Sequence, residues 1–176
     1  MQDPVGLVTT VAFVATVGAA GLLDLRTRRI PNRLTVGSLL VALGLNAVAG
    51  LGALSDALMG AGLGLVVGVV LFAFRALGGG DGKLLVAVGA FMGLSRLPGA
   101  LLLIGILGGF LGLGEAIRRG VILPSLYNAV GMLKRWITFR RGGEERTLES
   151  PGAVTVPYGV AIAVGAIAWW FWGVPL

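Results

Sequence analysis

The chain has 176 residues, of which 56% are hydrophobic and only 12% are charged, and its mean hydropathy is +0.94. This composition excludes an ordinary water-soluble domain and predicts an integral membrane protein. Cysteine and histidine are absent, which excludes disulfides, thiol nucleophiles, Ser-His-Asp sites and Cys or His metal sites. The net charge of +6 would suggest a nucleic-acid partner in a soluble protein. Here the basic residues lie between apolar runs, so we interpret them as topology signals and expect no nucleic acid.

Six apolar runs follow one another along the chain, and they predict an all-α membrane protein with about six transmembrane helices. No Arg or Lys precedes the first run, so it lacks the basic segment of a signal peptide and should remain in the mature protein. The fourth run is short, and we expect it to extend toward the glycines before it or to be buried among its neighbours. The runs cover residues 5–23, 34–54, 57–77, 84–94, 99–117 and 156–174.

Within the third run, Gly60, Gly64 and Gly68 recur at intervals of four residues and therefore share one face of a helix. Small residues at this spacing allow helix backbones to approach closely in lipid. We interpret the stripe as ordinary helix packing.

The region between the fifth and sixth runs, residues 118–155, is the largest polar stretch. Leu126, Val130, Leu133 and Ile137 recur there at helical spacing beside basic residues, which predicts an amphipathic helix on the cytoplasmic membrane surface. We therefore expect residues 1–176 to form a single transmembrane domain with this region as a cytoplasmic loop.

Orientation follows from the rule that cytoplasmic loops carry an excess of Lys and Arg. With six crossings, 13 of the 14 basic residues fall on one side, and only Arg96 falls on the other, together with Asp3 and Asp56. The basic side is then cytoplasmic, and both termini lie on the non-cytoplasmic side.

Two aspartates stand out because carboxylates at a membrane boundary are costly and are functional candidates. Asp24 ends the first run, and Asp81 follows three glycines directly before the fourth. Two crossings separate them, so both return to the cytoplasmic side. Two such carboxyl groups can hydrolyse a peptide if one takes a proton from water while the other donates one to the carbonyl oxygen. The glycines leave room for an extended substrate strand.

Each aspartate also has a structural interpretation. Asp24 could pair with Arg26 or Arg28 at a helix end, and Asp81 could be the N-cap of the fourth segment. Their coincidence on one side favours the catalytic interpretation.

Three motifs resemble those of the type IV prepilin peptidases, which belong to the GxGD intramembrane aspartyl proteases. Asp24 to Thr35 (DLRTRRIPNRLT) is similar to the first catalytic motif of that family, Gly78 to Leu84 (GGGDGKL) to its GxGDxK motif, and Val156 to Gly159 (VPYG) to its last-helix motif. Gly82 departs from the small aliphatic residue expected after the second aspartate.

The resemblance implies that Asp24 and Asp81 are catalytic and that neither a metal nor another cofactor takes part. It implies a prepilin substrate, whose basic leader is cut at the cytoplasmic face just before its hydrophobic helix, in the inner membrane of a prokaryote. It also implies supporting residues: Lys83 could stabilise charge near the dyad or anchor the loop, and Tyr158 and Gly159 would pack beside the site. Substrate-positioning candidates are Gly78, Gly80, Lys83, Pro31 and Asn32, although Pro31 and Asn32 also fit a simple helix-entry turn.

The chain resembles the short form associated with Flp-type pili of tight-adherence systems, so we expect no cysteine-containing N-terminal domain of the kind that larger members carry. Leader cleavage is therefore the expected activity, and N-methylation is left open. Two other hypotheses remain: a GxGD protease that cuts helices within the bilayer, and a proton- or cation-coupled transporter subunit. The Ile-Pro-Asn continuation after Asp24 argues against the first. The position of both aspartates at one boundary, without an inverted repeat, argues against the second.

Overall fold

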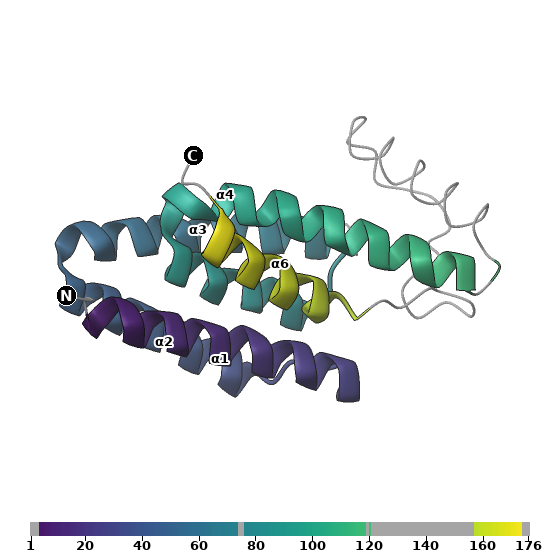
Figure 1. The fold of residues 1–176 in the computed structure, drawn as a ribbon, viewed down its shortest axis with the longest axis horizontal. Coiled ribbons are helices and arrows are strands. Elements are labelled where there is room, and N and C mark those ends of the chain that lie inside the picture. The colour runs from purple at the N-terminus through teal and green to yellow at the C-terminus, as the bar shows by residue number, and fades with distance from the viewer. Residues whose placement is uncertain (1–3, 74–75, 119, 121–156, 174–176) are drawn as a thin grey trace. The chain divides into compact units, whose positions relative to one another are not determined.

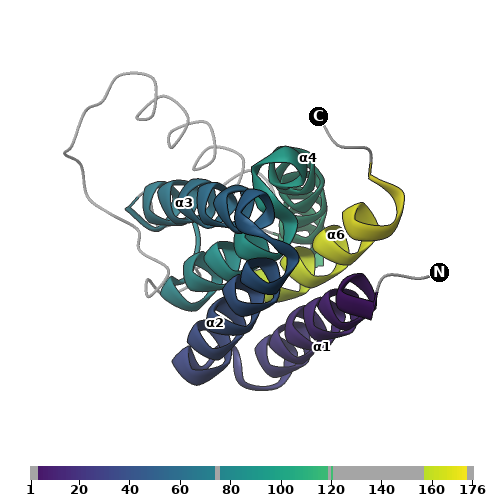
Figure 2. The same ribbon diagram turned by 90° about the vertical axis from the view of Figure 1, so that its left-hand side faces the viewer.

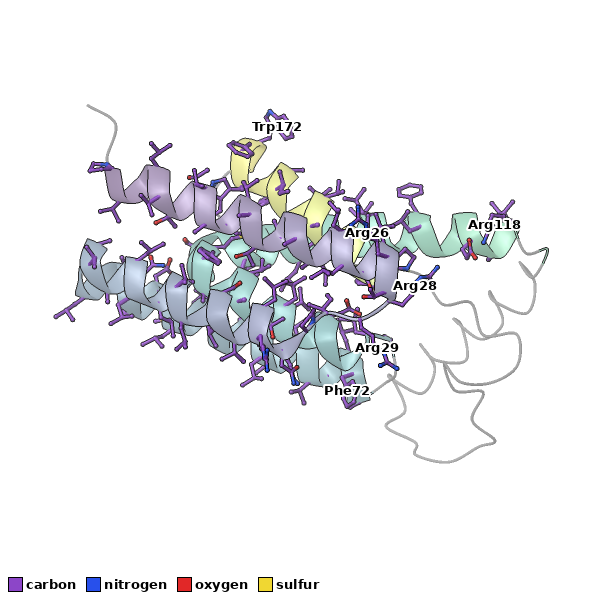
Figure 3. All side chains as sticks on the ribbon, turned by 90° about the horizontal axis from the view of Figure 1, so that it is seen from below. Arg26, Arg28, Arg29, Phe72, Arg118 and Trp172 are labelled. Atoms are coloured by element: carbon purple, nitrogen blue, oxygen red, sulfur yellow. The ribbon has the colours of Figure 1, made fainter. Side chains whose placement is uncertain are left out.

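A computed structural model describes residues 4–73, 76–118, 120 and 157–173. All regular structure in these ranges is helical, which confirms the predicted all-α class. The chain divides into two compact units, one formed by residues 1–108 with 157–176 and the other by residues 109–156. The predicted surface helix lies outside the described residues, and the prediction of a single domain remains a prediction. In the second unit, Arg118 at the end of its helix forms an ion pair of 2.8 Å with Glu115 (Figure 3).

Within the described ranges, four helices are long and apolar enough to cross a membrane, and a fifth is apolar but shorter. In the first unit, α1 packs against α2 and α6, and α2 packs against α3 (Figure 1). These features support a multi-pass membrane protein, while the number of crossings remains a prediction. The helices are α1 (Pro4–Thr27), α2 (Asn32–Ala49), α3 (Leu51–Ala73), α4 (Gly79–Arg118) and α6 (Tyr158–Trp172).

The boundary between the second and third predicted runs was wrong. Gly50 has a φ of 126° and ends α2, and α3 begins at the next residue. Leu51 to Leu54 therefore belong to α3 and not to the preceding helix. Only glycine adopts this backbone conformation at low cost, and an apolar run with glycines inside it does not reveal which of them forms the turn.

The fourth and fifth predicted runs are two halves of α4, separated at Gly93, where φ is 73° and ψ is 175°. Asp56 of α3 accepts hydrogen bonds from the backbone N–H of Leu94 at 3.0 Å and from the Ser95 hydroxyl at 3.3 Å. It thereby satisfies donors at the start of the second half. Figure 1 shows the ribbon of α4 doubling back at this point.

Contacts of each half of α4 agree with this reversal. The first half lies against α3, with Gly82 near Gly68 and Gly89 near Gly60. The second half lies against α6, and there Ile104 approaches Gly165. Seen from the end, α6 lies between α1 and the part of this second half that belongs to the first unit, residues 94–108 (Figure 2). The prediction that the fourth and fifth runs are separate helices is therefore confirmed.

The predicted glycine stripe on α3 is a helix-packing surface. A Cβ added at Gly64 would collide with the carbonyl oxygen of Leu85, and one added at Gly68 would lie 2.9 Å from the carbonyl oxygen of Gly82. Gly60 meets the backbone of Gly89 in the same way. The stripe thus brings α3 into backbone contact with the first half of α4, which carries Asp81.

Part of the buried core of the first unit is a cluster of three aromatic side chains. Phe13 of α1 is fully buried, stacks on Trp170 at 4.5 Å between ring centroids, and meets the edge of Phe91 at 5.6 Å. Many large apolar side chains point outward instead, as expected for helices whose outer surface faces lipid. These include Val41, Val48, Leu65, Val69 and Leu102.

Candidate active site

Asp24 lies in the last turns of α1 and is buried, with 6% of its surface exposed. Its Oδ2 accepts a hydrogen bond of 2.8 Å from the backbone N–H of Gly159, in the first turn of α6. The first N–H groups of a helix have no partner within the helix, so a carboxylate there satisfies a donor that would otherwise be unpaired. The Asp24 side chain therefore lies at the start of α6 and not in solvent at the end of α1.

Asp81 is the third residue of α4, and its Oδ2 accepts a hydrogen bond of 3.2 Å from the backbone N–H of Gly78. The alternative that Asp81 is the N-cap was therefore wrong in position. Gly78 precedes the helix, and Asp81 reaches back to it from the third helical position, as the acidic member of a capping box does. This contact orients the carboxyl group and leaves its other oxygen available.

The two carboxyl groups share one cavity of about 320 Å³. They are close enough to interact electrostatically, although α2 and α3 separate them along the chain. The prediction that two crossings bring them back to one side is consistent with this geometry. The lining consists of Asp24, Arg28, Arg29, Ile30, Gly78, Gly79, Gly80 and Asp81.

The two glycines predicted to position substrate have contacts within the fold. A Cβ at Gly80 would lie 3.2 Å from Cβ of Ile30, in the loop between α1 and α2, and one at Gly78 would lie 3.0 Å from Oδ2 of Asp81. A side chain at either position would therefore be in tight contact with a neighbour. Because both also line the cavity, a substrate role remains a prediction.

The remaining sequence candidates lie beside the cavity and do not line it. Lys83 donates a hydrogen bond of 2.8 Å from Nζ to Oδ1 of Asn32. Pro31 precedes α2 in an extended conformation and accepts the first backbone hydrogen bonds of that helix. Lys83, Asn32 and Pro31 thus connect the starts of α2 and α4, and the expected helix-entry turn is present.

The sequence analysis did not identify Arg28 and Arg29 as residues that line this cavity. Figure 3 shows both side chains just after the end of α1. Arg28 has a φ of 54°, and its N–H donates to the carbonyl oxygen of Asp24 at 2.9 Å, so it closes α1 in the left-handed conformation that usually belongs to glycine. Its side chain interacts electrostatically with the Asp24 carboxyl group. No pattern in the sequence marks this backbone conformation.

Tyr158 and Gly159 were expected to pack beside the site, and they do. Tyr158 lies against Gly108 and interacts electrostatically with Asp81. A Cβ at Gly159 would lie 2.8 Å from Cβ of Asp24, so only glycine allows the two backbones to come this close. The VPYG motif was the sequence signal that could have placed Gly159, the hydrogen-bond donor to Asp24, beside the site.

Residues 11–113 match the family described as the type IV leader peptidase family. This range includes both aspartates and exceeds half of the chain. The chain belongs to the type IV leader peptidase family.

Curated relatives in this family share the same region. The chain is 38% identical over 108 residues to a prepilin leader peptidase/N-methyltransferase of Aeromonas hydrophila. It is 37% identical over 108 residues to the protein of that name from Aeromonas salmonicida strain A449. Each match covers 57% of this chain and 37% of the relative, so the match spans little more than a third of their length. No solved structure matches the chain.

Proposed function

We propose that this member of the leader peptidase family is a prepilin leader peptidase in which Asp24 and Asp81 form the catalytic dyad. The observation that supports this most directly is that the two buried or part-buried carboxyl groups share one cavity, each oriented by a backbone N–H. One ionised carboxylate takes a proton from water as the water attacks the scissile carbonyl carbon. The other, protonated, carboxyl donates to the carbonyl oxygen, which gives a tetrahedral gem-diol. The first carboxyl then passes its proton to the amide nitrogen, which leaves as an amine when the C–N bond breaks, and the second carboxylate regains its proton as the gem-diol collapses to the product acid.

We further propose that the substrate is a Flp-type prepilin, cut at the cytoplasmic face of a prokaryotic inner membrane. The cavity lies at the end of the bundle that carries Arg26, Arg28 and Arg29 (Figure 3), as the charge rule requires for a cytoplasmic end. Lys83, which bonds to Asn32 at the start of α2, adds a further positive charge there. The outward-facing apolar side chains favour a substrate helix that approaches through the bilayer. Both termini then lie on the non-cytoplasmic side.

The direct test is cleavage of a purified Flp-type prepilin by the full chain in detergent. Asp24→Asn and Asp81→Asn should each abolish product formation, since Asn keeps the shape but cannot carry the exchanged proton. Asp56→Asn is the matched control: it removes a carboxylate at the opposite end of the bundle, and its amide oxygen can still cap α4. We expect this control to cleave normally.

Circular dichroism and thermal unfolding should confirm that all three variants fold. Authentic cleavage by either dyad variant would remove that residue from the catalytic role. If the wild-type chain leaves prepilin intact but cuts a transmembrane helix, the chain is another GxGD protease. If it cuts neither, a proton- or cation-coupled carrier becomes the better hypothesis.

A further inference from the structure

A second, larger cavity of about 570 Å³ lies between α1, α2, α4 and α6. Thr10 on its wall precedes Asp24 by 14 residues in α1, so the cavity lies roughly 21 Å from the dyad along the helix axis. Val5, also on the wall, precedes Asp24 by 19 residues, so this part of the cavity lies about 28 Å from the dyad, close to the roughly 30 Å thickness of a bilayer hydrocarbon core. The cavity therefore opens near the membrane surface opposite the candidate active site.

The cavity contains one positive charge, the guanidinium of Arg96. Its Nη2 donates to the carbonyl oxygen of Trp170 at 2.7 Å, and its Cζ lies 5.2 Å from the centroid of the Trp170 ring. Its Nε is buried and has no hydrogen-bond partner among the described residues. Trp170 thus holds the guanidinium in place while N–H donors remain unused.

No carboxylate in the described part of the chain lies within ion-pairing distance of Arg96. Asp56 is bonded to the two residues just before Arg96. Both of its carboxylate oxygens accept hydrogen bonds there, one from Leu94 and one from Ser95. A partly buried arginine that has no counter-ion among the described residues is costly at a membrane boundary. An external anion would offset this cost.

The rest of the wall is mostly apolar, formed by Val5, Leu7, Leu45, Ala49 and Phe91. The hydroxyls of Thr9 and Thr10 already donate to backbone carbonyl oxygens within α1. Asn46, which also lines the cavity, donates through Nδ2 to the carbonyl oxygens of Ala42 and Ala90. Among the described lining residues, the free donors for an anion therefore come from Arg96, and the apolar part of the wall suits hydrocarbon. A ligand that matches both features has an anionic head and an apolar chain.

We propose that this cavity binds an acidic phospholipid from the membrane leaflet on the side away from the dyad. Its phosphate would bind Arg96, and the part of an acyl chain nearest the headgroup would lie against α1 and α2. The shared chemistry is phosphate recognition by a guanidinium. The apolar wall favours a lipid over free phosphate. The proposal does not depend on peptidase activity.

The test uses the full chain in nanodiscs of phosphatidylcholine with and without phosphatidylglycerol, read out by native mass spectrometry and thermal unfolding. Wild type should retain phosphatidylglycerol in preference to phosphatidylcholine and unfold at a higher temperature when it is present. Arg96→Gln should retain about tenfold less, since a charge-assisted hydrogen bond is lost. Arg26→Gln, an exposed arginine at the other end, is the matched control and should behave as wild type.

A second variant keeps the proposal testable if Arg96→Gln folds poorly. Ala49 is exposed on the cavity wall, so Ala49→Trp should fill the cavity without displacing a buried neighbour and should also reduce retention. Undiminished lipid retention by both variants would overturn the proposal. Equal retention of phosphatidylcholine would overturn the preference for an acidic lipid. Equal stabilisation by inorganic phosphate alone, in detergent, would assign the site to a soluble anion instead.

Discussion

The backbone N–H of Gly159 donates a hydrogen bond of 2.8 Å to Oδ2 of Asp24, which lies 135 residues earlier in the chain. This contact joins the start of α6 to the end of α1. It requires the absence of a side chain at 159, because a Cβ there would lie within 3 Å of the Asp24 side chain. The orientation of one member of the proposed dyad therefore depends on a residue outside both aspartate motifs.

Gly159→Ala should lower kcat/KM for prepilin cleavage by about tenfold or more, because Asp24 must move away from its N–H donor. The added methyl group should also cost about 1–3 kcal/mol of unfolding free energy through overpacking. Gly18→Ala is the matched control in α1, where an added Cβ meets nothing within 4 Å. Equal activity of the two variants would show that the Gly159 contact does not position Asp24.

Arg28→Gly should separate stability from activity. Glycine adopts the left-handed conformation of residue 28 without strain, so the unfolding free energy should rise by about 1 kcal/mol. Cleavage should fall, because the guanidinium lines the cavity and interacts with Asp24. Thermal unfolding and steady-state kinetics measure the two effects. A variant that is more stable and fully active would leave Arg28 with no role in the site.

The glycine stripe on α3 can be tested with two neighbouring alanines. Gly64→Ala should destabilise the protein by about 2–3 kcal/mol, since its Cβ collides with the backbone at Leu85 and separates α3 from α4. Gly62→Ala, where nothing lies within 4 Å, should be neutral or slightly stabilising. Thermal unfolding in one detergent compares them directly. Similar melting temperatures would contradict the close approach of the two helices.

Orientation can be measured with single cysteines, because the chain has none of its own. Thr27 ends α1 and Ser55 lies in the second turn of α3, and both are exposed. Figure 1 shows the end of α1 and the start of α3 at opposite ends of the bundle. A membrane-impermeant thiol reagent should label Thr27→Cys only from the cytoplasmic side and Ser55→Cys only from outside. Labelling of Thr27→Cys from outside would reverse the proposed topology and remove the site from the cytoplasm.

Part of the fold was readable from local patterns. The apolar runs predicted the helices, since each crossing needs a continuous apolar stretch of nearly fixed length. The spacing of Gly60, Gly64 and Gly68 predicted a packing face that the structure contains. The two aspartates were identifiable because placing a carboxylate at a membrane boundary costs free energy, and such residues are therefore functional candidates.

Tertiary structure alone decided which side chains meet. Helices that are apolar on all faces carry little periodicity, so the sequence does not indicate which face turns inward. The turn at Gly50 and the reversal at Gly93 depend on backbone conformations that many glycines could adopt, and Asp56 caps the second of these from a different helix. The motif suggested that Lys83 stabilises charge near the dyad, which remains a prediction, and only the tertiary structure shows its hydrogen bond to Asn32. The VPYG motif places Gly159 beside the site, but its hydrogen bond to Asp24 joins residues 135 positions apart, and no local pattern indicates that bond. The left-handed conformation that closes α1 at Arg28 has no sequence signal either.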